Sequence, residues 1–86
     1  MSEQAPQIPP HQQRVLAEYE QIATWHVKLD AFILGEMFRT LDKYEQDRLY
    51  VQNSIQHSYM TVLISRLENM GLSKELAEID KRVRAL

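Results

Sequence analysis

The chain has 86 residues and no cysteine, so it is one small domain without a disulfide framework or a thiolate metal site. Its 44% hydrophobic and 26% charged residues are typical of a globular protein and argue against wholesale disorder. A net charge of −2 argues against nucleic acid or an anionic membrane surface as a partner. No apolar run approaches the ~20 residues of a membrane span, and the N-terminus lacks a signal-peptide core, so we expect a cytoplasmic protein.

Residues 1–10 (MSEQAPQIPP) are polar, contain three prolines and show no periodicity. We expect a disordered lead-in over 1–10 and a single helical domain over 11–86. A domain this small is only marginally stable alone, and without cysteine we expect oligomerisation to supply the missing stability.

Apolar residues recur at helical spacing over residues 12–34, and Gly35 stands where a helix C-cap is expected. The apolar arc of this helix is wider than a two-helix hairpin needs, which indicates subunit packing. Trp25 lies in the arc and is expected out of water, against the partner helix or another subunit. His26 also lies there, and a lone histidine among apolar neighbours is usually a core or interface residue.

Residues 35–41 predict a turn or a single helical turn, and Asp42 followed by Glu45 resembles a capping box. A long helix is therefore expected over 43–70, ending at Gly71. Its apolar arc is about twice the ~100° of an ordinary surface helix. Within the arc, Gln52, Tyr59 and Arg66 follow one another seven residues apart. This polar column is either a buried hydrogen-bond ladder or a ligand site.

Ser73 is a suitable N-cap for a last helix over 74–86. Leu76, Ile79, Val83 and Leu86 form its one apolar stripe. The fold class we predict is all-α: an antiparallel helical hairpin with a C-terminal third helix, assembled as a homo-oligomeric helical bundle.

No motif for catalysis is present. Gly35 and Gly71 are the two glycines, so there is no Gly-rich phosphate loop, and no histidines have metal-ligand spacing. We therefore expect no enzyme, no cofactor and no metal site.

Between residues 11 and 70 the chain contains, in order, HQQRVLAEYEQIATWHVKLDAFI, F-x-x-L, EQDRLYVQ and Y-x-x-V-L-x-x-R-L. This order of motifs resembles a group of small phage and prophage proteins that are described by similarity to a protein of a crAss-like phage. The matching residues are His11, Gln12, Arg14, Val15, Lys28, Leu29, Phe32, Ile33, Glu45, Gln46, Arg48, Leu49, Gln52, Tyr59, Val62, Leu63 and Arg66. Tyr19, Met60 and Ile64-Ser65 depart from the group's pattern. The resemblance implies a phage origin and no established activity.

Several polar and aromatic residues could converge at a subunit boundary on an anionic, planar ligand. Arginine grips phosphate, glutamine reads a base edge, and an aromatic ring stacks on the base. The candidate ligand-binding residues are Arg14, Trp25, Lys28, Arg48, Gln52, Tyr59 and Arg66.

These residues and the resemblance lead to two candidate functions. In the first, a phage-encoded helical oligomer sequesters a nucleotide-type immune signal of the host, such as a cyclic nucleotide. In the second, the protein is an interaction module that inhibits a host or phage protein and has no small-molecule site.

Overall fold

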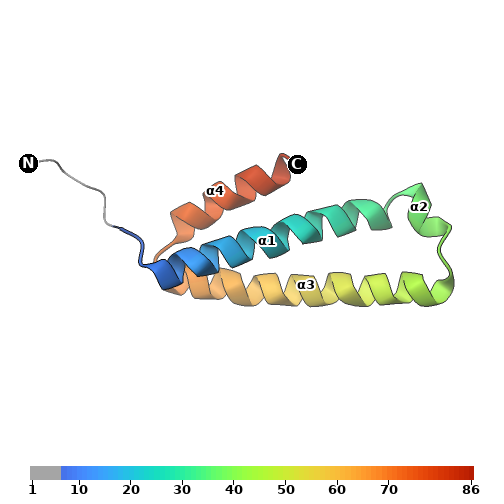
Figure 1. Ribbon diagram of the computed structural model, residues 1–86, viewed down its shortest axis with the longest axis horizontal. Helices are drawn as coiled ribbons and strands as arrows, with labels where there is room; N and C mark the ends of the chain where they lie inside the picture. The colour runs from blue at the N-terminus through green and yellow to red at the C-terminus, as the bar shows by residue number, and fades with distance from the viewer. Residues whose placement is uncertain (1–6) are drawn as a thin grey trace, which may run out of the picture.

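The computed structural model describes residues 7–86, and every regular element in this range is a helix (Figure 1). The long helices α1 (Pro10–Ile33) and α3 (Lys43–Asn69) form an antiparallel hairpin, with the short α2 (Glu36–Arg39) in the connection between them. The last helix, α4 (Ser73–Arg84), folds back along the N-terminal half of α1. The predicted helical class and hairpin are thus confirmed. Residues 1–6 of the predicted lead-in lie outside the described residues.

The ends of α3 follow the sequence closely. Asp42 is its N-cap, and the Glu45 backbone N–H donates a hydrogen bond of 2.8 Å to Asp42 Oδ1, as predicted. At the other end Gly71 has a φ of 78°, which a residue with a side chain rarely adopts, so glycine suits this turn. The Leu72 N–H then donates to the Leu67 carbonyl at 2.9 Å, and the chain reverses into α4.

Two capping predictions are wrong. Leu34 is the C-cap of α1, and Gly35 is instead the N-cap of α2 with a φ of −92°. Ser73 is the first residue of α4 rather than its N-cap, which is Leu72, and no side chain caps this end. Helix α1 also begins earlier than residue 12, the predicted start. Pro9 is its N-cap and Pro10 its first residue, because the fixed φ of proline suits a first helical turn.

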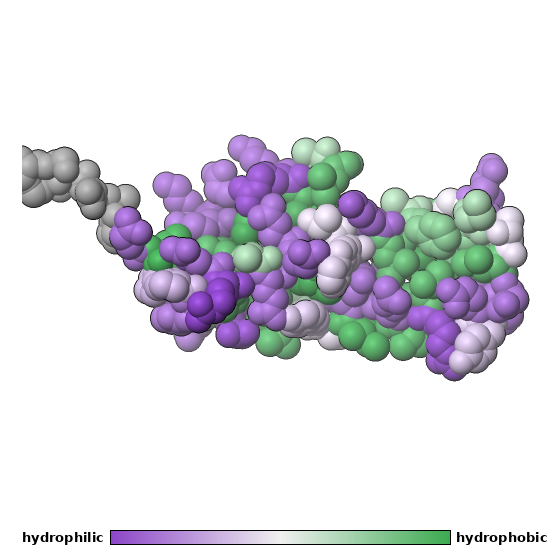
Figure 2. All heavy atoms as spheres, in the orientation of Figure 1, coloured by the Kyte–Doolittle hydropathy of each residue, from purple (hydrophilic) through white to green (hydrophobic). Residues whose placement is uncertain are grey.

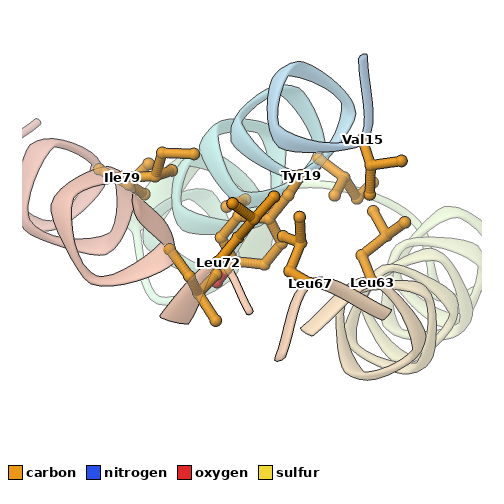
Figure 3. Packing of buried hydrophobic residues seen from close by; sticks show 10 residues of the cluster. Val15, Tyr19, Leu63, Leu67, Leu72 and Ile79 are labelled. Carbon is orange, nitrogen blue, oxygen red and sulfur yellow. The ribbon is translucent and has the colours of Figure 1, made fainter. Parts of the chain in front are cut away.

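The hydrophobic core lies where α4 packs against the hairpin. Figure 3 shows Val15 of α1 facing Leu63 of α3, and Tyr19 reaching toward Leu67 and Leu72. The cluster consists of Val15, Tyr19, Ile22, Ala23, Leu63, Leu67, Leu72, Leu76, Ile79 and Val83. Helix α4 therefore covers part of the broad arc of α1 that was expected to face another subunit. Leu86, which was predicted in the apolar stripe of α4, is exposed.

Two polar contacts attach α4 to α1. The buried Tyr19 hydroxyl donates a hydrogen bond of 2.6 Å to Asp80 Oδ1, and Arg82 donates to both carboxylate oxygens of Glu20, at 2.8 and 3.2 Å. Burial of the tyrosine, with its bond to Asp80, raises the pKa of Tyr19. The hydrogen bond from Arg82 lowers the pKa of Glu20.

The raised pKa of Tyr19 predicts a loss of stability in alkali. An unfolded tyrosine ionises near pH ~10, whereas folded Tyr19 stays neutral, so its contribution is complete below pH ~10 and is lost as the pH rises further. The free energy of unfolding should fall by up to ~1.4 kcal/mol per pH unit there, as urea unfolding can measure. Tyr19→Phe should flatten this dependence. The control Tyr44→Phe, at an exposed ring, should leave it as steep as in the parent; equal slopes in all three proteins would contradict the assignment.

A polar cluster joins α1 and α3 halfway along the hairpin. His26 Nδ1 lies 3.1 Å from Oε1 of the buried Gln56, and Asn53 Nδ2 donates to Asp30 Oδ1 at 2.6 Å. The interpretation of His26 as a partnered interface residue is confirmed. These bonds help to fix the register of the hairpin, because a slip would leave Gln56 buried without a partner.

None of the helices within residues 7–86 combines the length and the apolar character that crossing a membrane requires.

Candidate ligand-binding groove

A groove runs along α1, on a different side of the helix from the one that α4 covers. Its volume is about 480 Å³, within the range of small-molecule sites. Most of its wall comes from successive turns of α1, and α3 contributes Tyr59. We call it the aromatic groove, and it is lined by Arg14, Ala17, Glu18, Gln21, Ile22, Trp25 and Tyr59.

The two aromatic rings are the main apolar surfaces of the groove. Trp25 is 54% exposed and Tyr59 is 39% exposed, so the flat rings are accessible to a ligand. The two rings stand on α1 and α3, the helices that the polar cluster joins. Accessible aromatic faces stack on nucleobases with little regard to base identity.

The polar groups of the groove are few and varied. Arg14 can bind an anion, Gln21 can donate and accept hydrogen bonds, and Glu18 can accept them from an amino group or a hydroxyl. Arg14 makes no ion pair with any residue in 7–86, so its guanidinium is available. A flat ring that carries both an anionic group and hydrogen-bond donors therefore suits these walls.

Three of the seven candidate residues predicted from the sequence line the groove: Arg14, Trp25 and Tyr59. The other four are exposed and lie outside it: Lys28, Arg48, Gln52 and Arg66. Lys28 follows Trp25 by three residues on α1, so it lies one turn further along the helix. The Arg48 guanidinium lies over the Tyr44 ring, 4.6 Å from its centroid. No ion pair within the described part of the chain involves Lys28, Arg48 or Arg66.

The column of Gln52, Tyr59 and Arg66 is not a buried ladder within the chain. All three side chains are exposed, and none hydrogen-bonds to another residue in the described range. The buried polar residue of α3 is instead Gln56, which faces α1. The structure of the single chain thus argues against the buried ladder, and the column as a ligand site stays a prediction, with Tyr59 as its one residue in the groove.

Trp25 also differs from the expectation that the hairpin would bury it. The centre of the apolar arc of α1, at Tyr19 and Ala23, faces α3 and α4, while Trp25 lies at the edge of that arc. Burial of Trp25 against another subunit stays a prediction. The ~3–5 kcal/mol that truncation of a buried large aromatic side chain typically costs therefore does not apply to Trp25→Ala within the single chain.

Gln21 and Glu18 are groove residues that were not among the candidates predicted from the sequence. The sequence pattern puts Gln21 on the polar side of the first helix, opposite the apolar arc. The sequence contained a signal for Gln21, because Arg14, Gln21 and Lys28 follow one another at intervals of seven and so share one side of α1.

No group of three His, Asp or Glu side chains within residues 7–86 is arranged to hold a metal ion.

The fold and the groove define a small helical-hairpin protein with an accessible aromatic and cationic surface. A family model named Sequestin matches residues 9–69, from the start of α1 to the end of α3. The chain belongs to the Sequestin family. The family name indicates sequestration and names no ligand. Comparison with curated proteins and with solved structures found no match to either.

Proposed function

We propose that this protein is a phage-encoded sponge, which binds a nucleotide-type immune signal of the infected bacterium and so disarms a defence system. The observation that carries the proposal is the aromatic groove, where the available Arg14 guanidinium and the accessible rings of Trp25 and Tyr59 meet. The family name supports sequestration, and the resemblance to phage proteins supports the origin. The protein would act in the host cytoplasm as a homo-oligomer, without a cofactor.

The proposed binding mode assigns one task to each group. The ligand's base stacks on Trp25 or Tyr59, its phosphate binds Arg14, and Gln21 contacts the base edge. Lys28 and Arg66 add long-range attraction for an anion. Sequestration requires no chemistry, so the protein is not an enzyme and should release its ligand unchanged.

A screen for thermal stabilisation tests this proposal. We expect a cyclic dinucleotide, a cyclic trinucleotide or an adenosine diphosphate-ribose-type molecule to stabilise the protein, by ~2.7 kcal/mol at 100 times its Kd. Trp25 is the one tryptophan of the chain, so its fluorescence reports directly on the groove. Denaturing the complex should return the ligand intact.

Variants then locate the binding site. Trp25→Ala should weaken binding roughly 5- to 150-fold, from the ~1–3 kcal/mol of one stacked base, and Arg14→Ala should abolish the preference for anions. Lys81→Ala removes an exposed cation of α4 and serves as the matched control. Binding that survives Arg14→Ala and Trp25→Ala, or no response to any nucleotide in the screen, would reject the groove as the site.

The second candidate, an interaction module for another protein, is favoured by a different observation. At the α2 end of the hairpin, Leu34 and Met37 are among the most exposed apolar side chains, and Figure 2 shows apolar surface there. Isolated exposed apolar side chains are common, so we rank this function second.

A further inference from the structure

The outer side of α3 lacks the charges that a solvent-exposed helix normally carries. Between Arg48 and Arg66 the helix has no Asp, Glu, Lys or Arg. Gln56 and Leu63 face the hairpin, whereas Val51, Ile55 and Val62 are exposed. Figure 2 shows apolar surface along the edge of α3 that faces away from α1. Such a helix is typical of one that packs against neighbours on two sides.

The exposed residues of this stretch have the spacing of a helix-packing face. Val51, Ile55 and Val62 are separated by four and seven residues and share one side of α3. The small side chains of Ser54 and Ser58 lie beside this stripe and would allow a second helix to come close. We call this the outer face of α3.

We propose that the outer face of α3 binds the same face of a second copy, in an antiparallel pair about a two-fold axis near Gln56. At this register Val51 meets the partner's Val62, and Ile55 lies beside the partner's Ile55, so the apolar stripe matches itself. A two-fold interface requires such self-complementarity.

The charges at the ends of the face fit the same register. Lys43 forms an exposed ion pair with Asp47 on its own helix. In the proposed pair its ammonium group, before the uncharged stretch, would also lie beside the partner's Glu68, and the symmetry would provide this contact twice. The antiparallel arrangement also sets the positive N-terminal end of one helix beside the negative C-terminal end of the other. A second copy of the chain, running antiparallel, presents the same apolar spacing and the complementary order of charges.

The opposite edge of the pair brings Arg48 near the partner's Arg66. These like charges repel each other, and an anion between them would relieve the repulsion. A nucleotide should therefore strengthen the pair. This consequence rests on the proposed function, whereas the contact between the two α3 helices does not.

Single cysteines test the interface, because the chain has none of its own. Ile55→Cys should be cross-linked into a covalent dimer by a short bismaleimide, without any nucleotide present. In the same register two copies of Ser65→Cys lie ~27 Å apart along the helix axes, so this control should not react. Light scattering should give a multiple of 10.2 kDa for the parent. A monomeric parent, no cross-link through Ile55→Cys, or equal cross-linking of both variants would overturn the proposal.

Charge exchange tests the register separately. Lys43→Glu should weaken the dimer roughly 3- to 10-fold at low ionic strength, and the double variant Lys43→Glu/Glu68→Lys should restore it. A double variant no tighter than the single one would contradict the pairing. Ile55→Glu should dissociate the dimer while its helical content stays that of the parent. If the Ile55→Glu variant keeps the Trp25 fluorescence response to nucleotide, the groove binds its ligand independently of the interface. The proposed nucleotide site and the proposed α3 interface can therefore fail separately.

Discussion

Removal of α4 by truncation after Gly71 should abolish cooperative unfolding of the chain. Leu76, Ile79 and Val83 are buried against α1 and α3, and full burial of such side chains contributes ~1.5–3 kcal/mol each. Their loss removes about 5–9 kcal/mol, which is most of the ~5–15 kcal/mol that stabilises a typical domain. Thermal unfolding followed by circular dichroism would show a broad, non-cooperative change in place of a transition.

The truncation also removes the partners of two side chains of α1. Tyr19 loses its bond to Asp80 and Glu20 loses Arg82, and the apolar part of Tyr19 becomes exposed to water. Deletion of Ala85 and Leu86 alone is the matched control, since both residues are exposed. A truncated chain that unfolds as cooperatively as the parent would show that the hairpin is a domain by itself. The Sequestin match stops before α4, so this experiment asks whether the segment common to the family folds without it.

Periodicity and capping signals were sufficient to predict the hairpin. The start of α3 at Lys43 and its end before Gly71 depend on local chemistry, namely the Asp42 side chain and a residue that tolerates positive φ. The last helix was predicted from one stripe, of which Leu76, Ile79 and Val83 are buried. These features depend on residues close in sequence, so the sequence contains them directly.

Which neighbouring helix covers each part of an apolar arc could not be predicted in the same way. A helical wheel gives the direction of a side chain, but it does not say which neighbour lies there. Tyr19 and Trp25 both belonged to the arc of the first helix, yet α4 and α3 cover Tyr19 and leave Trp25 at the edge. The same limit explains why Gln56, and not Gln52, is the buried glutamine of α3.

The candidate site was predicted in part for a related reason. Arg14, Trp25 and Tyr59 were selected separately, and the pairing of α1 with α3 brings them to one groove. Gln52 and Arg66 lie seven residues before and after Tyr59, about 10 Å along the axis in each direction, and of these three residues Tyr59 alone lines the groove. A heptad column describes a whole side of a helix, whereas the groove lies along α1 and takes one residue of that column, Tyr59, from α3.

Leu67→Ala should destabilise the protein by ~3–5 kcal/mol, the cost of removing a fully buried leucine side chain from a core that cannot collapse. Leu67 is 0% exposed, and its backbone carbonyl accepts the hydrogen bond from Leu72 that closes the turn into α4. Its side chain packs with Tyr19 and Leu72 where α1, α3 and α4 meet, so a cavity there loosens α4 as well as the hairpin (Figure 3). Leu34→Ala makes the same chemical change at a side chain that is 80% exposed, and it should cost less than ~0.5 kcal/mol. Urea unfolding of both variants measures the difference, and similar losses at the two positions would mean that the core does not lie at the junction of α1, α3 and α4.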